Sequence, residues 1–261
     1  MRWKLTLEYD GTNFCGWQRQ ENGLSVQQAL EEAIQKFSGE SVTLFAAGRT
    51  DAGVHAKAQV VHGDLAKDTN ADTVRDAINF HLKPHRIAVL KAEPVAGDFH
   101  ARFGATSRRY RYQIIHRRAP PALLADFAWH VPKPLDLAPM QEAAKLLLGK
   151  HDFSTFRAQN CQSNSPIKTL DAFEIAREDE LVLFNCRARS FPYHQVRNMV
   201  GTLVLVGTGQ WTLEDFKAAF AACDRKAGGP TAPAHGLFFW QVEYEENQSE
   251  ATQTKPGRIY Y

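Results

Sequence analysis

Cysteines are scarce in this 261-residue chain, and the four that occur lie far apart. No Cys-x-x-Cys pair or cysteine–histidine cluster is present, which argues against a zinc site and against a framework of disulfide bonds. Cys186 falls in an expected strand and Cys223 in an expected helix, so we expect both thiols to lie in the core. This usage is typical of a protein of the reducing cytoplasm.

Several longer signals are absent as well. The most apolar run, residues 199–206, is far too short to cross a bilayer, and the N-terminal segment alternates like a strand, unlike a signal peptide. Neither a phosphate-binding P-loop, a GxGxxG motif, an HExxH motif nor a GxSxG motif occurs. We therefore expect no membrane association, no metal and no nucleotide cofactor.

The net charge is also small, at +2, but the charged residues are unevenly distributed along the chain. Six arginines and no acidic residue fall between Arg102 and Arg118. A local basic stripe on a nearly neutral protein is typical of a surface that binds a polyanion, although the solvated face of an arginine-rich strand gives the same pattern. The stripe alone leaves both interpretations open.

The remaining sequence contains two similar series of strands and helices. Apolar residues recur with strand and helix periods in the order β-α-β-β-α-β, first in the N-terminal part and again in the C-terminal part, with one added helix at residues 212–223. This order is that of the ferredoxin-like unit. We therefore predict an α/β protein of two tandem ferredoxin-like halves, residues 1–104 and 105–246, whose sheets form one extended platform with a central cleft. Residues 247–261 form a polar tail that we expect to be poorly ordered.

Capping residues mark the expected helix boundaries. Ser25 and Gln28 predict a capping box, and Gly39 ends the same helix. A second-half helix over residues 192–207 is expected to carry Pro192 in its first turn, where a missing N–H costs no hydrogen bond. Spacings of three, four and seven give this helix a polar face of His194, Arg197, Asn198 and Gly201.

The segment GRTDAGVHA, residues 48–56, stands between two apolar strands. It closely resembles the signature loop of the tRNA pseudouridine synthases that act at tRNA positions 38 to 40, in the anticodon arm. Four further segments agree with that family and occur in its order: YDGTNFCGWQRQ, DFHARFGATSRRYRY, DFSTFRA and FPYHQVRNMVGTL. The resemblance covers roughly residues 3–244, although Gly104 and Gln195 stand where relatives often carry other residues.

The resemblance implies an isomerase that breaks the bond between uracil N1 and ribose C1′, turns the base, and joins C5 to C1′. Such a reaction needs neither ATP nor a redox cofactor. It needs one carboxylate near C1′ and C6, which attacks or stabilises the sugar carbon or removes a proton from the sugar. The family pattern assigns this role to Asp51, whereas an aspartate in such a turn, taken alone, also fits a purely structural role.

Three other side chains complete the implied site. Arg49 suits a substrate phosphate or, alternatively, an internal salt bridge. Arg197 is implied to pair with the catalytic carboxylate and to keep it ionised. Tyr110 is implied to stack on the target uridine, which has to leave the stem before C1′ can be reached, and to offer a hydroxyl for proton transfer.

The predicted RNA-binding residues follow from the basic stripe and its interleaved aromatic residues. Strand alternation puts Arg108 on the face of Tyr110, and we favour that face for the cleft. His55 either touches RNA or is a buried, hydrogen-bonded histidine, and the loop around Arg19 can insert beside the target base. The predicted set is Tyr110, Arg49, His55, His100, Arg102, Phe103, Arg108 and Arg19.

The family resemblance also implies a homodimer in which one tRNA touches both subunits. Two other functions fit parts of the pattern: an RNA-binding protein that has lost catalysis, and a metal-dependent nuclease on the same basic platform. The complete set of Arg49, Asp51, Tyr110 and Arg197 argues against the first, and the lack of clustered carboxylates and histidines argues against the second.

Overall fold

The structure is a computed structural model that describes residues 1–159, 161 and 165–245, so the expected tail at residues 247–261 lies outside the described residues. Its strands are β1 (Arg2–Tyr9), β2 (Phe45–Ala46), β3 (His55–Asp64), β4 (Ile87–Val95), β5 (Ala105–Ile115), β6 (Trp129–His130), β7 (Gly149–Asp152), β8 (Ile167–Glu178), β9 (Leu181–Ala188) and β10 (Leu237–Tyr244). Its α-helices are α1 (Val26–Ser38), α2 (Ala71–Leu82), α3 (Leu137–Lys145), α4 (Gln195–Gly207) and α5 (Leu213–Ala221). Short 3₁₀ turns are η1 (Ser154–Phe156), η2 (Arg225–Ala227) and η3 (Ala234–Gly236).

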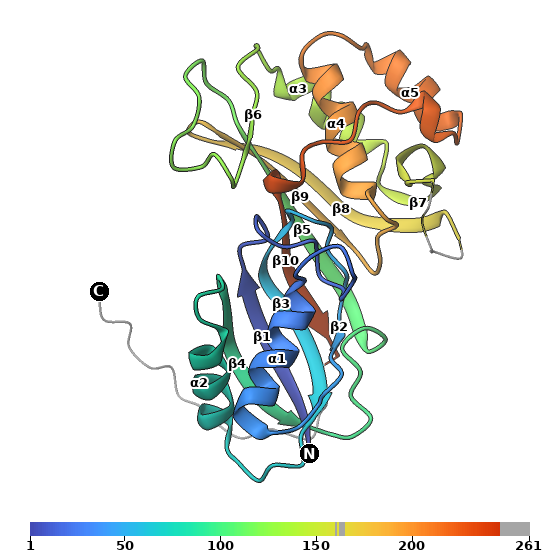
Figure 1. Cartoon of the computed structure of the whole chain (residues 1–261). Coiled ribbons are helices and arrows are strands. Elements are labelled where there is room, and N and C mark those ends of the chain that lie inside the picture. Colours follow the sequence, from blue (N-terminus) through green and yellow to red (C-terminus); the bar gives the residue numbers. More distant parts are fainter. Residues whose placement is uncertain (160, 162–164, 246–261) are drawn as a thin grey trace, which may run out of the picture.

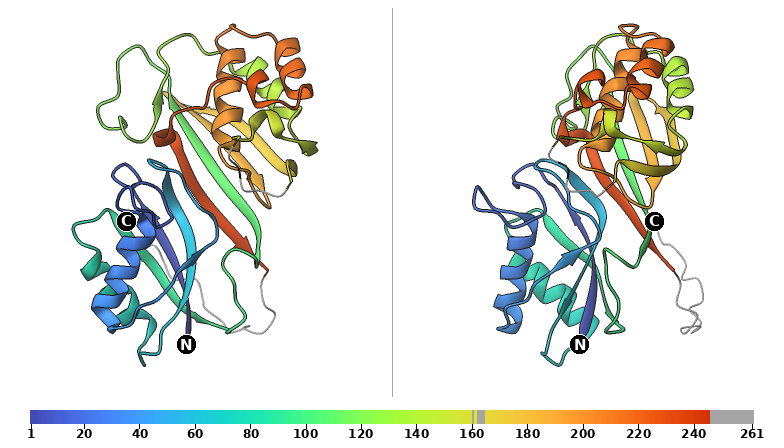
Figure 2. Two further views of the ribbon diagram at one scale, coloured as in Figure 1. Left: turned by 45° about the vertical axis from the view of Figure 1, so that its right-hand side comes forward. Right: turned by 90° about the vertical axis from the view of Figure 1, so that its right-hand side faces the viewer.

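All the described strands belong to one sheet, in the order β4-β1-β3-β10-β5-β9-β8-β7, with β2 on β3 and β6 on β5 (Figures 1 and 2). The last strand, β10, lies between β3 of the N-terminal part and β5 of the C-terminal part. It runs antiparallel to β5 over its whole length, but meets β3 in parallel only at Phe238 and Phe239. The mixed α/β class and the continuous sheet are confirmed, while the boundary near residue 104 stays a prediction.

The buried core consists of two clusters of apolar side chains. One gathers between β1, β3, β4 and the helices α1 and α2, and the other between β5, β8, β9 and the helices α3, α4 and α5 (Figure 1). Each cluster takes one residue from the opposite part of the chain: Phe239 of β10 lies in the first, and Val54 lies in the second. Tyr110 packs against both clusters. The loop before β3 therefore lies where the two cores meet.

The start of α4 differs from the sequence prediction. His194 caps the helix in the left-handed region, with φ 64°, so Pro192 precedes the helix instead of lying in its first turn. The expected polar face is also largely buried. A Cβ on Gly201 would lie 1.9 Å from the carbonyl oxygen of Pro230, and Asn198 is 1% exposed, because the segment after α5 packs over this face.

Two smaller predictions need correction as well. Ser25 accepts a hydrogen bond from the Gln28 amide, but the Gln28 side chain bonds Glu32 one turn further on, so the capping box is not completed. Cys186 is buried as expected, whereas Cys223 is exposed because it follows the end of α5 with φ 48°. Among the described residues no helix is both long and apolar enough to span a membrane.

Candidate active site

The loop between β2 and β3 presents Asp51 at the junction of the two cores. The Val54 amide donates to the Asp51 carbonyl at 3.1 Å, which closes a tight turn, and Gly53 in that turn adopts φ 76°. Glycine is favoured there because a side chain disfavours this conformation. From the other side Gly16 pairs with Asp51, and a Cβ on Gly16 would come within 2.8 Å of the Thr50 carbonyl oxygen. The backbone of Asp51 is thus held on both sides.

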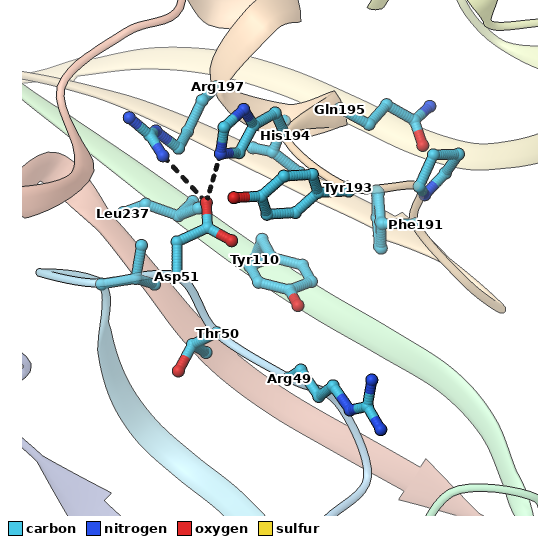
Figure 3. A pocket seen from close by; sticks show the side chains of 13 residues that line it. Arg49, Thr50, Asp51, Tyr110, Phe191, Tyr193, His194, Gln195, Arg197 and Leu237 are labelled. Carbon is cyan, nitrogen blue, oxygen red and sulfur yellow. Dashed lines mark hydrogen bonds and ion pairs between the residues drawn. The ribbon is translucent and has the colours of Figure 1, made fainter. Parts of the chain in front are cut away.

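Two cationic or hydrogen-donating side chains meet the same oxygen of Asp51 (Figure 3). Arg197 Nη1 donates to Asp51 Oδ2 at 2.8 Å, and His194 Nε2 lies 3.2 Å from the same atom. Arg197 is held in turn by a 2.8 Å bond from its Nε to the carbonyl of Ala232. The other oxygen, Oδ1, points toward the side of Tyr110 and Tyr193, and among the described residues no hydrogen bond reaches it (Figure 3).

The surroundings of Asp51 decide its charge. Burial of this carboxyl raises its pKa, but the hydrogen bonds and charges of His194 and Arg197 outweigh burial, and the net pKa lies below its ordinary value. The side chain is only 18% exposed, so these two contacts are weakly screened by solvent. Asp51 is therefore an ionised carboxylate at neutral pH with one oxygen engaged and one available.

Tyr110 forms the wall beside this carboxylate. Its ring meets the edges of Phe191 and Phe239, each with a centroid distance of 5.0 Å and nearly perpendicular planes. Burial, and secondly the negative charge of Asp51, raise the pKa of the Tyr110 hydroxyl well above its ordinary value. The hydroxyl is consequently neutral at physiological pH and able to donate a hydrogen bond.

Asp51, Tyr110 and Arg197 line one pocket, together with Arg49. The structure thus brings the predicted catalytic residues together from the β2–β3 loop, β5 and α4. Arg49 is exposed, and its guanidinium points away from Asp51 (Figure 3). Within the part of the chain that the structure describes, no group of three or more histidine, cysteine, aspartate or glutamate side chains could hold a metal ion.

Arg108 does not lie where the RNA-binding prediction put it. The side chain is buried, and its Nε and Nη2 donate to the Ala47 carbonyl at 3.0 and 2.9 Å. Further bonds reach the carbonyls of Arg102, at 2.6 Å, and of Arg189. The face of β5 that carries Tyr110 turns inward, so Arg108 holds backbone segments together and its donors are occupied by protein. Direct contact with a phosphate is contradicted by this burial.

His55 follows the structural alternative. The ring is 1% exposed; its Nδ1 accepts from the Gly11 amide at 3.0 Å, and its Nε2 lies 2.8 Å from the Asp126 carbonyl. Burial, only partly offset by Asp10, lowers the pKa of His55 below its ordinary value. This histidine therefore connects the N-terminal loop to the segment after β5 and is not exposed to RNA.

The remaining predicted RNA-binding residues lie outside the pocket. Arg102 and Phe103 are exposed on the loop before β5, and His100 is partly buried beneath them. Arg19 is about half exposed and pairs with Glu31 at 3.0 Å. Their contacts with RNA stay predictions.

His194 also lines the pocket, together with Phe191 and Tyr193, although the sequence patterns did not predict these three as site residues. His194 stands three residues before Arg197, the spacing at which two side chains share a helix face, and that signal was available. The ring of Tyr193 lies against His194 with a centroid distance of 3.8 Å. These three residues form the short bend before α4, a feature that periodicity does not reveal.

Comparisons with known proteins identify the family of this chain. A sequence model described as tRNA pseudouridine synthase matches residues 6–104 and 143–245. Curated relatives named tRNA pseudouridine synthase A include a protein of Rhodospirillum centenum, 61% identical over 93% of this chain and 99% of its own, and one of Paramagnetospirillum magneticum, 55% identical over 97% and 99%. A third, from Maricaulis maris, is 54% identical over 93% and 98%. Because the family model covers most of the chain and these relatives are more than half identical over nearly its whole length, the chain belongs to the tRNA pseudouridine synthase family.

Proposed function

We propose that this protein converts uridine to pseudouridine in the anticodon arm of tRNA, at positions 38 to 40, with Asp51 as the catalytic carboxylate. One observation carries the proposal: Arg197 and His194 engage Oδ2 of Asp51 and leave Oδ1 directed into the pocket beside Tyr110. Family membership supplies the reaction class and the substrate class.

The geometry suits a reaction in which substrate and product are isomers. The N1–C1′ bond of the uridine breaks, the base turns, and a C5–C1′ bond forms. Oδ1 of Asp51 can attack C1′, attack C6, or remove a proton from the sugar, since each route needs an ionised carboxylate with a free oxygen. Arg197 keeps that carboxylate ionised and fixes its rotation.

Tyr110 contributes a flat surface and a neutral hydroxyl. A uridine has to leave its base pair before Asp51 can reach it, and an aromatic ring stabilises such an extruded base by stacking. When the new bond has formed, the proton on C5 has to leave, and N1 gains a proton. Because its hydroxyl is protonated, Tyr110 takes part in that transfer as a relay that accepts one proton while it passes on its own.

The proposal extends to binding and location. tRNA is the partner, held by exposed basic residues such as Arg49, Arg102 and Arg19 outside the catalytic pocket, and the reaction takes place in the cytoplasm. We further propose a homodimer on which one tRNA touches both subunits; sedimentation of the protein with and without tRNA tests this arrangement.

The activity test uses tRNA whose uridines carry tritium at C5. Wild-type protein should release tritium into water and produce pseudouridine at positions 38 to 40, whereas Asp51→Asn should release none. A protein that binds tRNA but releases no tritium would be the non-catalytic RNA binder. Cleavage of the tRNA that stops on addition of a chelator would identify a nuclease.

A further inference from the structure

A row of aromatic rings reaches the surface beside β2, away from the catalytic pocket. Phe45 stacks on His62, its cross-strand neighbour, with a centroid distance of 5.2 Å and a 22° angle between the planes. His62 meets His100 at 4.6 Å, and His100 meets Phe103 at 4.4 Å. Phe45 is 49% exposed and Phe103 is 72% exposed. We call these four residues the aromatic platform.

Phe103 lies in a hydrogen-bonded turn that leaves its ring exposed. His100 Nδ1 accepts from the amides of Arg102, at 3.1 Å, and of Phe103, at 3.3 Å. The Gly104 amide donates to the His100 carbonyl at 2.9 Å. The ring of Phe103 is therefore displayed from an ordered turn, and little conformational entropy has to be lost before a ligand can use it.

The charge around the platform favours an anion. The Arg102 guanidinium carbon lies 5.6 Å from the centroid of the Phe103 ring. Burial, together with the positive charges of Arg2 and Arg102, lowers the pKa of His100 below its ordinary value. Two acids lie near Arg2: Asp64, which Arg2 engages through a 2.8 Å ion pair, and Asp98, whose negative charge also acts on Arg2. A cation beside an exposed ring is the combination that holds a phosphate next to a stacked base.

Hydrogen bonds connect the platform to the loop that carries Asp51. The buried guanidinium of Arg108 donates both to the carbonyl of Ala47, next to the platform strand, and to the carbonyl of Arg102. Phe45 and Asp51 are six positions apart, so the chain between them spans at most about 22 Å when extended. One single-stranded segment of RNA can therefore touch both places.

We propose that the aromatic platform binds an unpaired base of the substrate tRNA, which stacks on Phe103 while Arg102 contacts an adjoining phosphate. This inference rests on the proposed function, since it assumes that tRNA occupies the Asp51 pocket. It assigns a second contact to the same RNA, in which stacking adds to the charge attraction that the basic residues supply.

The first test compares Phe103→Ala with Phe80→Ala, a matched control because Phe80 on α2 is 69% exposed. Loss of one stacked base should weaken tRNA binding by about 5- to 150-fold in Phe103→Ala, with no change in Phe80→Ala. No charge is removed, so the slope of log affinity against log salt should stay the same. Arg102→Ala should instead lower that slope by about 0.7, the contribution of one phosphate contact on a single strand.

The second test uses Phe103→Trp as a reporter of contact. Tryptophan keeps the stacking surface, so tRNA affinity should stay close to that of the wild type, and tRNA should quench the added fluorescence. Phe80→Trp should show no more quenching than the wild-type protein. Melting temperatures of all variants should agree, because both phenylalanines are exposed.

Three outcomes would refute the proposal that the platform binds an unpaired base of tRNA. Phe103→Ala could bind tRNA within two-fold of the wild type, or Phe103→Trp could be quenched no more than Phe80→Trp. A change in sedimentation with unchanged tRNA affinity would assign Phe103 to a contact between protein subunits. Wild-type tritium release is measured in the same preparations, so a failure of the platform is distinguished from a failure of the proposed function.

Discussion

His194 offers the sharpest test of how this site holds its carboxylate. We choose His194→Asn, because asparagine tolerates the left-handed conformation at this position, φ 64°, while its shorter side chain cannot reproduce the 3.2 Å contact to Asp51. The fold should therefore persist while one of two contacts to Oδ2 is lost. Arg197 still holds that oxygen at 2.8 Å.

The expected magnitude follows from the kind of bond removed. A hydrogen bond to a charged group contributes about 1.5–3 kcal/mol, and the remaining Arg197 contact favours the lower end of that range. With about 1.4 kcal/mol for each factor of ten, kcat should fall by roughly ten-fold. KM for tRNA should stay constant, because His194 lies in the pocket of Asp51 and not on the exposed basic surface.

The pKa of Asp51 also determines the direction in which the pH dependence of kcat should change in His194→Asn. His194 and Arg197 depress the pKa of Asp51, so loss of His194 should raise that pKa. A larger fraction of Asp51 is then protonated at acidic pH, and the acidic limb of the kcat profile should move to higher pH. The deficit in kcat should consequently grow as the pH is lowered from 8 toward the pKa of the Asp51 carboxyl.

The assay is single-turnover tritium release over this pH range. The control is His81→Asn, because His81 is a half-buried histidine on α2, remote from the pocket. A kcat within two-fold of the wild type, together with an unmoved acidic limb, would refute the idea that His194 positions Asp51. A lower kcat matched by an equal loss of folded protein would point to a structural role alone.

Three further predictions concern the arginines and the carboxylate. Asp51→Asn should melt normally and bind tRNA as the wild type does, yet retain less than a tenth of the single-turnover rate, because asparagine can neither attack nor take a proton. Arg197→Lys should lose at least about ten-fold in kcat, since lysine cannot donate to Asp51 and to the Ala232 carbonyl with a planar fork; near-normal turnover would show that charge alone suffices. Arg108→Ala should lower the melting temperature and leave the salt slope of tRNA binding unchanged, because it strips buried carbonyls of donors; a flatter slope at normal stability would restore Arg108 to the RNA path.

Much of the local structure could be predicted from residue patterns. The apolar stripe that begins at Val26, with its Ser25 cap and Gly39 stop, predicts α1 correctly, because helix period and capping depend on near neighbours. The alternation around Tyr110 also predicts which side chains share a face of β5. Short elements escape such patterns: β7, from Gly149 to Asp152, has only four residues, too few for a clear strand alternation.

The resemblance in the GRTDAGVHA segment identified Asp51, and four companion segments identified the family, since these residues stand in fixed order along the chain. The resemblance also implied that Arg197 pairs with Asp51, but residue patterns do not show how segments so far apart in sequence come together. Asp51 and Arg197 lie 146 positions apart, and only the joining of β3, β10 and β5 in one sheet brings them within 2.8 Å.

Burial likewise depends on contacts remote in sequence. Alternation places Arg108 and Tyr110 on one face of β5, but whether that face is open to RNA depends on what packs against it. Carbonyls from Ala47 and Arg189, far from Arg108 in sequence, surround its guanidinium and make it a structural residue. The sequence by itself determined the longer elements, the loop that carries Asp51 and the family, because these rest on local order and motif. The tertiary structure alone decided the pairing of Asp51 with His194 and the burial of Arg108, because both arise where chain segments distant in sequence pack together.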